Sequence, residues 1–234
     1  MILSPVTPRE EIMRACSLLM EPGSVHEVRI PKAGRRGTIS GYFDDRERLA
    51  DAILSIDGTV SGVYLTMNPC RPALLARAAN RLQDHAKVTT ADKDIIRRRW
   101  LLLDFDPIRP TGISSTNHEH GRAFSAALGA WDDLRGMSFP DPIVADSGNG
   151  AHLLYRVDFP NDSDATELIR GILAGVAASC APDDVDVDLT VYNAARICKL
   201  YGTLACKGDS TPERPHRRAR LLEIPDQISA LESQ

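Results

Sequence analysis

The sequence predicts a mixed α/β or α+β domain, because segments with helical and with strand patterning alternate along its 234 residues. Hydrophobic residues make up 43% and charged residues 26%, which is typical of a globular protein and unlike a disordered or fibrous chain. The longest apolar stretches are too short to span a membrane, and the first residues lack the parts of a signal peptide. We therefore expect one cytoplasmic domain over 1–234, with subdomains of about 1–95 and 96–224.

Start and stop signals locate the first helix. Thr7 can cap it, Pro8 suits its first position, and Glu10 completes a capping box three residues after Thr7. Glu21-Pro22-Gly23 should end it. Hydrophobic periodicity and turn residues then predict a hairpin over 25–43, a helix over 44–56, a strand over 62–67 and a helix over 74–82.

The second half of the chain carries the segments with candidate chemistry. Trp100–Asp106 is an apolar strand that ends in carboxylates, and Thr116 with Glu119 opens a helix to about Leu134. The pattern further predicts strands over 143–145 and 152–157, a helix over 162–180, a strand over 185–192 and a closing strand over 219–224.

Cysteine usage and net charge limit the function classes. The five cysteines are scattered without a C-x-x-C pair, which disfavours a disulfide framework, and we expect no structural zinc. The formal net charge is −4, so the protein is not coated in positive charge. Nucleic acid would have to bind through local basic patches around an acidic site.

Asp104 and Asp106 form the first candidate site. Side chains alternate along a strand, so both carboxylates point to the same side, with Cα atoms roughly 6.5 Å apart. This spacing suits one or two divalent cations. Two solvated aspartates at a strand end would give the same pattern, but the apolar approach from Trp100 to Leu103 favours the functional edge of a buried sheet.

The turn Ser147-Gly148-Asn149-Gly150, followed by Ala151-His152, is the second candidate. Glycine allows backbone N–H groups to approach a phosphate closely, and Ser147 and His152 add donors beside them. An ordinary hairpin turn has the same appearance, since Asn-Gly is a common hairpin dipeptide. The turn is neither a Walker loop nor a dinucleotide-binding fingerprint.

Residues 187–203 form the third candidate, in which an acid on an apolar strand is followed by Arg196 and Lys199. Asp186 and Asp188 lie on the same face of the expected strand, so the sequence leaves the choice between them open. An edge strand with solvated charges is the alternative interpretation.

Together, these three elements resemble the archaeo-eukaryotic primase superfamily, in particular the primase-polymerases of phages and plasmids. The family's motifs are an apolar strand ending in D-x-D or D-x-E, a Ser-Gly-x-Gly-x-His type turn, and a strand acid followed by Arg and Lys or Arg before Leu-Tyr or Leu-Pro. They are matched here by Asp104-Phe105-Asp106, by Ser147–His152, and by Asp188 with Arg196, Lys199 and Leu200-Tyr201. Their order and spacing agree, and the similarity extends over about residues 60–220.

The resemblance implies an archaeo-eukaryotic primase-like catalytic core, in which an N-terminal αβ unit packs on an RRM-like mixed β-sheet unit with flanking helices. It implies a DNA primase or DNA-directed polymerase that transfers dNTPs or NTPs to a 3′-hydroxyl on a single-stranded DNA template, in the replication of a mobile element. No helicase motor follows in this sequence, so the domain either works alone or belongs with a helicase domain or partner protein. Two Mg²⁺ or Mn²⁺ ions would be held by Asp104, Asp106 and Asp188. The nucleotide would be held by Ser147, Gly148, Asn149, Gly150, His152, Arg196, Lys199 and Lys207.

Three basic clusters lie at 29–36, 97–99 and 214–220. Most charge runs are solvated faces, and the first two clusters are balanced between template contact and plain surface. The last follows the third motif directly, and its expected nucleic-acid contacts are Arg214, His216, Arg217 and Arg218. His118-Glu119-His120 falls in the first turn of a helix and is expected to be exposed to solvent rather than to bind metal.

Two other functions remain open from the sequence. One is a non-catalytic module that binds single-stranded or origin DNA, and the other is a two-metal nuclease. The intact acids argue against the first, and the cations beside a triphosphate-like turn favour transfer over hydrolysis.

Overall fold

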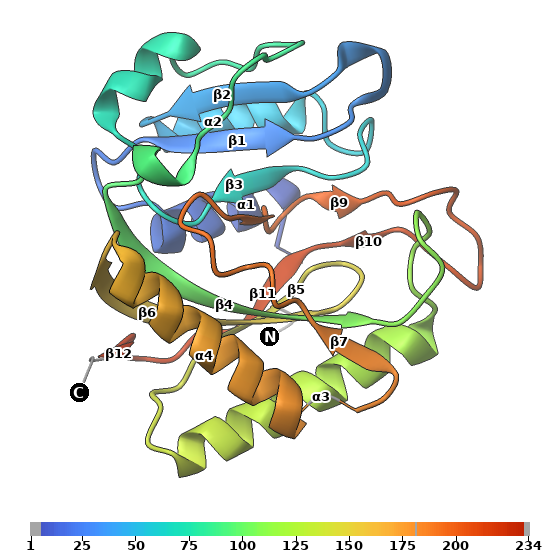
Figure 1. Ribbon diagram of the computed structural model, residues 1–234. Helices are drawn as coiled ribbons and strands as arrows, with labels where there is room; N and C mark the ends of the chain where they lie inside the picture. Colours follow the sequence, from blue (N-terminus) through green and yellow to red (C-terminus); the bar gives the residue numbers. More distant parts are fainter. Residues whose placement is uncertain (1–5, 181, 232–234) are drawn as a thin grey trace, which may run out of the picture.

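The computed structural model describes residues 6–180 and 182–231. Two β-sheets share one hydrophobic core, and Figure 1 shows the smaller sheet above the larger one. The buried core residues run from Ile12 near the start of the chain to Leu221 near its end. The predicted mixed α/β class is therefore confirmed.

The smaller sheet has the order β2-β1-β3-β8 and is antiparallel throughout. Its strands are β1 (His26–Ile30), β2 (Ile39–Phe43), β3 (Tyr64–Thr66) and β8 (Ile197–Lys199). The predicted hairpin and third strand are confirmed. The fourth strand comes from the second half of the chain, because β3 pairs with 197–199. A division near residue 95 therefore does not separate the segments that build the two sheets.

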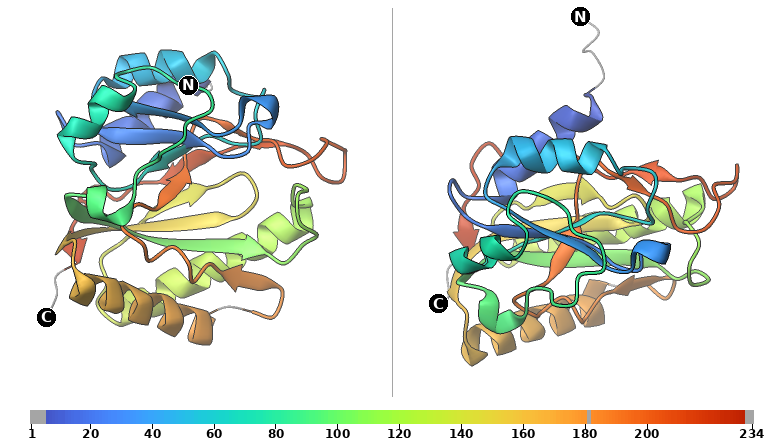
Figure 2. Two further views of the ribbon diagram at one scale, coloured as in Figure 1. Left: turned by 45° about the horizontal axis from the view of Figure 1, so that its top comes forward. Right: turned by 90° about the horizontal axis from the view of Figure 1, so that it is seen from above.

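Two capped helices, α1 (Pro8–Leu19) and α2 (Arg46–Leu54), pack side by side (Figure 2). Helix α2 contacts β2 of the smaller sheet, and α1 also contacts strand β11 (Arg220–Glu223). The predicted capping box is present, since the Thr7 hydroxyl accepts the Glu10 N–H and the Glu10 carboxylate accepts the Thr7 N–H at 2.8 Å. Asp45 caps α2 by accepting two backbone N–H groups. Both helices begin within about two residues of the predicted starts.

The helix predicted over 74–82 is wrong. Only a 3₁₀ helix, η2 (Pro72–Arg77), forms there, and the chain then runs along the outer edge of β2. The Tyr42 N–H donates to the Ala78 carbonyl, and Ser40 and Gln83 exchange backbone hydrogen bonds. Pairing with an open strand edge satisfies these backbone groups and overrides the local helical pattern. Short 3₁₀ helices also occur at η1 (Gly34–Arg36) and η3 (Asp92–Asp94).

The larger sheet has the order β11-β5-β6-β4-β7, with β12 added to β6. Its strands are β4 (Arg97–Pro107), β5 (Ile143–Asp146), β6 (Ala151–Pro160), β7 (Val185–Val187), β11 (Arg220–Glu223) and β12 (Ala230–Leu231). Helices α3 (Asn117–Gly136) and α4 (Ser163–Cys180) cover its face away from the smaller sheet (Figures 1 and 2). The succession β4-α3-β5-β6-α4-β7 is the β-α-β-β-α-β arrangement of an RRM-like unit, as expected.

A short antiparallel pair, β9 (Leu204–Ala205) with β10 (Arg217–Arg218), extends beyond the two sheets. The loop between them projects from the body of the molecule (Figure 2). In the described part of the chain, no helix combines the length and the hydropathy needed to cross a lipid bilayer.

Candidate active site

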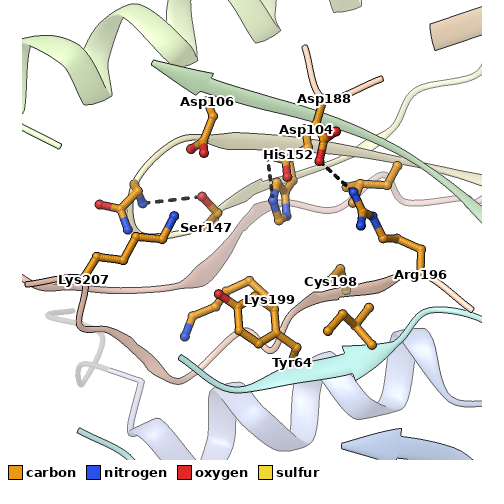
Figure 3. Close-up of a pocket in the computed structure, with 13 residues that line it drawn as sticks. Tyr64, Asp104, Asp106, Ser147, His152, Asp188, Arg196, Cys198, Lys199 and Lys207 are labelled. Atoms are coloured by element: carbon orange, nitrogen blue, oxygen red, sulfur yellow. Dashed lines mark hydrogen bonds and ion pairs between the residues drawn. The ribbon is translucent and has the colours of Figure 1, made fainter. Parts of the chain in front are cut away.

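A cavity of about 310 Å³ lies between the two sheets, and most of the predicted site residues line it (Figure 3). The acids come from the larger sheet, whereas Lys199 and Tyr64 come from adjoining strands of the smaller one. Gly148 and Gly150 are not among the lining residues. The polar side chains that line it are Tyr64, Asp104, Asp106, Ser147, Asn149, His152, Asp188, Arg196, Lys199 and Lys207.

The three predicted acids come together because β4 and β7 are neighbours. Asp104 and Asp106 alternate with buried Phe105 on β4. The pairing of Phe105 with Val187 places Asp188 opposite Asp104, and the Asp188 N–H donates to the Asp104 carbonyl at 3.0 Å. Residues opposite each other in an antiparallel pair share a face of the sheet.

The register alone does not separate Asp186 from Asp188, because each lies opposite one acid of β4, but the cavity lining does. Asp186 lies opposite Asp106 but is exposed and does not line the cavity, whereas Asp188 does. The strand predicted over 185–192 is too long, because β7 ends at Val187. The Asp188 carboxylate accepts the N–H and the hydroxyl of Thr190, both at 2.7 Å, and this local turn replaces further strand pairing.

Each acid has a cationic or imidazole partner. Asp188 pairs with Arg196 at 2.7 Å, and His152 Nε2 lies 3.3 Å from Asp104. Asp106 lies 3.3 Å from Arg109, a nearly buried arginine that the sequence interpretation missed. These partners reduce the repulsion between the carboxylates. Within residues 6–180 and 182–231, no three His, Cys, Asp or Glu side chains are grouped closely enough to hold a metal ion as they stand.

His152 is held between a carboxylate and a phenol. It lies opposite Asp104 in the β4–β6 pairing, and its Nδ1 lies 2.8 Å from the Tyr201 hydroxyl. Burial raises the pKa of Tyr201 well above its usual value, so the hydroxyl keeps its proton and stays a hydrogen-bond partner of Nδ1. The other ring nitrogen, Nε2, faces Asp104. Tyr201 belongs to the Leu200-Tyr201 pair of the third motif, and nothing in that motif indicated a contact with His152.

The electrostatics of Asp104 favour its ionised form. Burial alone would raise the pKa of this carboxyl group, but His152, with further contributions from Arg196 and Lys207, lowers it by more. The net pKa is below its usual value, so the carboxylate is negatively charged at neutral pH. A metal ligand must be in this state.

The glycine turn differs from the predicted cradle of free N–H groups. The Gly148 N–H donates to Asp146 at 2.6 Å, and the Asn149 and Gly150 N–H groups donate to the Ser147 hydroxyl oxygen. The turn is therefore closed by its own side chains and by the end of β5. The donors that face the cavity are side chains rather than the turn backbone.

Packing explains the glycine at position 150. A Cβ atom there would lie 2.1 Å from the Phe105 carbonyl oxygen and 3.1 Å from the Asp106 carboxylate. The turn therefore lies directly against the strand that carries the acids. Asn149 anchors its other side, because its side-chain oxygen accepts the Ser115 N–H at 2.9 Å.

Lys199 is a buried cation at the opposite wall of the cavity. Its Nζ donates to the Leu204 carbonyl at 2.7 Å and lies 5.8 Å from the centre of the Tyr64 ring. Burial lowers its pKa to about 7. Lys207 follows β9, and Figure 3 shows its side chain directed toward Ser147.

The basic clusters do not behave alike. Arg98 is buried and donates to the Tyr192 carbonyl and the Thr166 hydroxyl, whereas Arg97 and Arg99 pair with Asp158. Within the cluster at 97–99, only Arg98 is buried, whereas Arg97 and Arg99 are partly exposed and already paired. In the cluster at 29–36, Arg29 pairs with buried Glu27 at 2.5 Å and Arg36 with Asp84 at 2.7 Å.

The last cluster divides into two groups. Arg214 binds Glu119 through both terminal nitrogens at 2.8 and 2.9 Å, and the His216 ring contacts the Gly208 carbonyl. Arg217 and Arg218 instead line a second cavity. His120 also lines that cavity, and its Nε2 lies 3.0 Å from the carboxylate of buried Asp146. Because of this contact the His120 side chain is only 17% exposed, so the prediction that it is exposed to solvent is wrong.

Comparison with known proteins gives no match to a protein-family model and no match among curated proteins. Among solved structures, the crystal structure of primase RepB′ superposes with a TM-score of 0.52 at 11% identity, over 92% of this chain and 56% of that one. The catalytic domain of primase RepB′ with initiator DNA gives 0.48 at 11% identity, covering 91% and 85% of the two chains. The polymerase domain of Mycobacterium tuberculosis ligase D with DNA gives 0.47 at 15% identity, covering 91% and 81%.

The chain spans little more than half the length of primase RepB′. At this level of identity the similarity concerns the fold. The two-sheet architecture and the β-α-β-β-α-β unit agree with what the three motifs predicted. The chain therefore has the fold seen in primase RepB′, which agrees with the fold that its motifs predicted.

Proposed function

We propose that the chain is a primase-polymerase catalytic domain that adds dNTPs or NTPs to a 3′-hydroxyl opposite a single-stranded DNA template. The observation that carries this proposal is the charge distribution of one cavity. Asp104, Asp106 and Asp188 lie on one wall, and the cavity is completed by Arg196, Lys199 and Lys207. Carboxylates beside cations suit a metal-bound triphosphate, which needs both.

The donor set fits hard divalent cations. All three acids offer carboxylate oxygens, which are the ligands that Mg²⁺ and Mn²⁺ prefer, and Asp104 is ionised at neutral pH. When bound, such ions supply activation of the 3′-hydroxyl and neutralisation of charge on the triphosphate and the departing pyrophosphate. Asp104, Asp106 and Asp188 are the residues that would hold them.

The remaining side chains serve substrate binding. Arg196, Lys199 and Lys207 can offset the charge of a triphosphate, with Ser147 beside them as a hydroxyl donor. His152 lies against Asp104, and its two ring nitrogens are both engaged, so we assign it first to holding that carboxylate. Contact with the triphosphate requires it to exchange one of these interactions.

The experiment uses primed and unprimed single-stranded DNA, labelled dNTPs or NTPs, and Mg²⁺ or Mn²⁺. We expect the native chain to extend the primer and the variant Asp104→Asn/Asp106→Asn to fail. Asp186→Asn is the matched control, since Asp186 lies two residues from Asp188 but outside the cavity. This variant should retain extension.

Three outcomes contradict the proposal. Template shortening without extension identifies a nuclease. Binding of DNA with neither reaction identifies a passive DNA-binding module. Equal loss in Asp186→Asn and in the double variant shows that the cavity does not define the reacting centre.

A further inference from the structure

A second cavity, of about 710 Å³, lies beside the strand that leads into the glycine turn. Residues of α1, α3, β5, β10 and β11 line it, so no contiguous stretch of sequence marks it. Four of its lining residues are arginines, namely Arg14, Arg217, Arg218 and Arg220. In a chain with a net charge of −4, such a concentration of cations is a local exception.

The acids that line this cavity are engaged with the protein itself. Glu11 is buried and accepts the Leu221 N–H at 2.6 Å. Asp146 is buried and contacts both the Gly148 N–H at 2.6 Å and His120 at 3.0 Å. These carboxylates therefore help to build the wall and leave the arginines only partly compensated.

Two of the four arginines, Arg14 and Arg220, are only weakly engaged by the protein and remain available to a ligand. Arg220 is 65% exposed in its side chain, and its nearest acid, Asp146, is 3.9 Å away. Arg14 is 45% exposed and lies 3.6 Å from Glu11. Arg217 donates to neutral oxygens of Ser115, Pro215 and Asn117, with no carboxylate within 4.0 Å in the described part of the chain. Arg218 alone has a close acid, Asp57, at 2.5 Å.

We propose that this second cavity binds the phosphate backbone of a single-stranded nucleic acid. The assignment rests on the proposed function only in taking the strand to be the template. The two weakly paired cations, Arg14 on α1 and Arg220 on β11, come from different elements of the cavity wall. Separate cations that are open to solvent suit the successive phosphates of a strand.

The lining also indicates how the strand is bound. Among the described residues, the lining contains no Phe, Tyr or Trp on which bases could stack. Contacts to phosphate position a strand without reading its sequence. We therefore expect binding at this site to be independent of base sequence and strongly dependent on salt.

The cavity is also tied to the turn that lines the candidate active site. Asp146 faces the second cavity, and the same carboxylate accepts the Gly148 N–H of the turn. A strand bound here therefore lies next to the turn that borders the acids. This proximity is what a template contact requires.

The test measures binding of a fluorescent oligothymidylate of about 20 nucleotides, without nucleotide or divalent ion, between about 50 and 200 mM NaCl. The variant is Arg14→Gln/Arg220→Gln, and the control is Arg48→Gln/Arg170→Gln, which removes the same charge from exposed positions on α2 and α4. We expect about tenfold weaker binding for the first variant and a salt slope reduced by about 1.4, because each phosphate contact on a single strand contributes roughly 0.7. The control should match the native chain.

Equal weakening in both double variants overturns the proposal, as does unchanged binding in Arg14→Gln/Arg220→Gln. Arg14→Lys/Arg220→Lys should retain binding, and its failure would show that charge is not the cause. Inorganic phosphate is the competing probe. If Arg14→Gln/Arg220→Gln loses binding of inorganic phosphate but keeps binding of the oligothymidylate, the second cavity binds a free anion rather than a strand. Because no turnover is measured, these results stand apart from success or failure of primer extension.

Discussion

The buried amine of Lys199 allows a quantitative test of the candidate site. Its pKa is lowered to about 7 by burial, and the proposed function places the negative charge of a triphosphate in the same cavity. That charge should restore the protonated form. At pH 8, an amine with a pKa near 7 is only about one-tenth protonated, so nucleotide binding should take up about 0.9 proton. At pH 6 the uptake should fall to about 0.1.

Isothermal titration calorimetry measures this uptake directly, with dNTP and Mg²⁺ but no template, in two buffers of different ionisation enthalpy. Lys199→Arg keeps the cation but cannot change its charge, so its binding should take up no proton at pH 8. Lys207→Met removes a cation that is less buried and should leave the uptake in place. Nucleotide affinity of the native chain should also fall as the pH rises through 7.

Uptake that is the same at pH 6 and pH 8 would refute this reasoning, because it would mean that the Lys199 amine does not titrate on binding. Uptake that persists in Lys199→Arg would assign the proton to another group. Either result would leave the fold intact and remove Lys199 from the triphosphate site.

Two further sites give predictions about geometry and stability. Tyr201→Phe removes the hydrogen-bond partner of His152 Nδ1. We expect the free energy of unfolding to fall by about 1–3 kcal/mol and the ¹⁵N spectrum of the imidazole to show a changed tautomer balance. An unchanged spectrum would contradict the hydrogen bond between Tyr201 and His152. Gly150→Ala should lower both the melting temperature and primer extension, because its Cβ would lie 2.1 Å from the Phe105 carbonyl. Gly129→Ala, in exposed α3 with nothing within 4 Å, should instead stabilise the protein by about 0.5–1 kcal/mol, and chemical denaturation of the two alanine variants compares them.

The acids of the candidate site are already paired with side chains of the protein before any ligand binds. Asp104 contacts His152, Asp106 contacts Arg109 and Asp188 contacts Arg196. No sequence motif marked Arg109 as one of these partners. These pairs offset part of the negative charge of the carboxylates. Ligands that bind here must exchange part of this network rather than fill a bare cluster.

The sequence predicted local structure correctly where residues close together in the chain determine it. The capping boxes at Thr7 and Thr116 were found where they were predicted, because a cap is built within four residues. The strand that carries Asp104 and Asp106 was found for the same reason, since alternation places both side chains on one face. Three ordered motifs were then enough to predict the fold.

Tertiary structure decided everything that depends on partners distant in sequence. The helical pattern over 74–82 gave way to pairing with the edge of β2. Pairing of β7 with β4 brought Asp188 to the cavity, whereas Asp186 stayed outside it. Strand β8 placed Lys199 in the other sheet, opposite the acids. Periodicity along a chain determines which face a side chain takes, but only long-range pairing of backbone groups determines what that face meets.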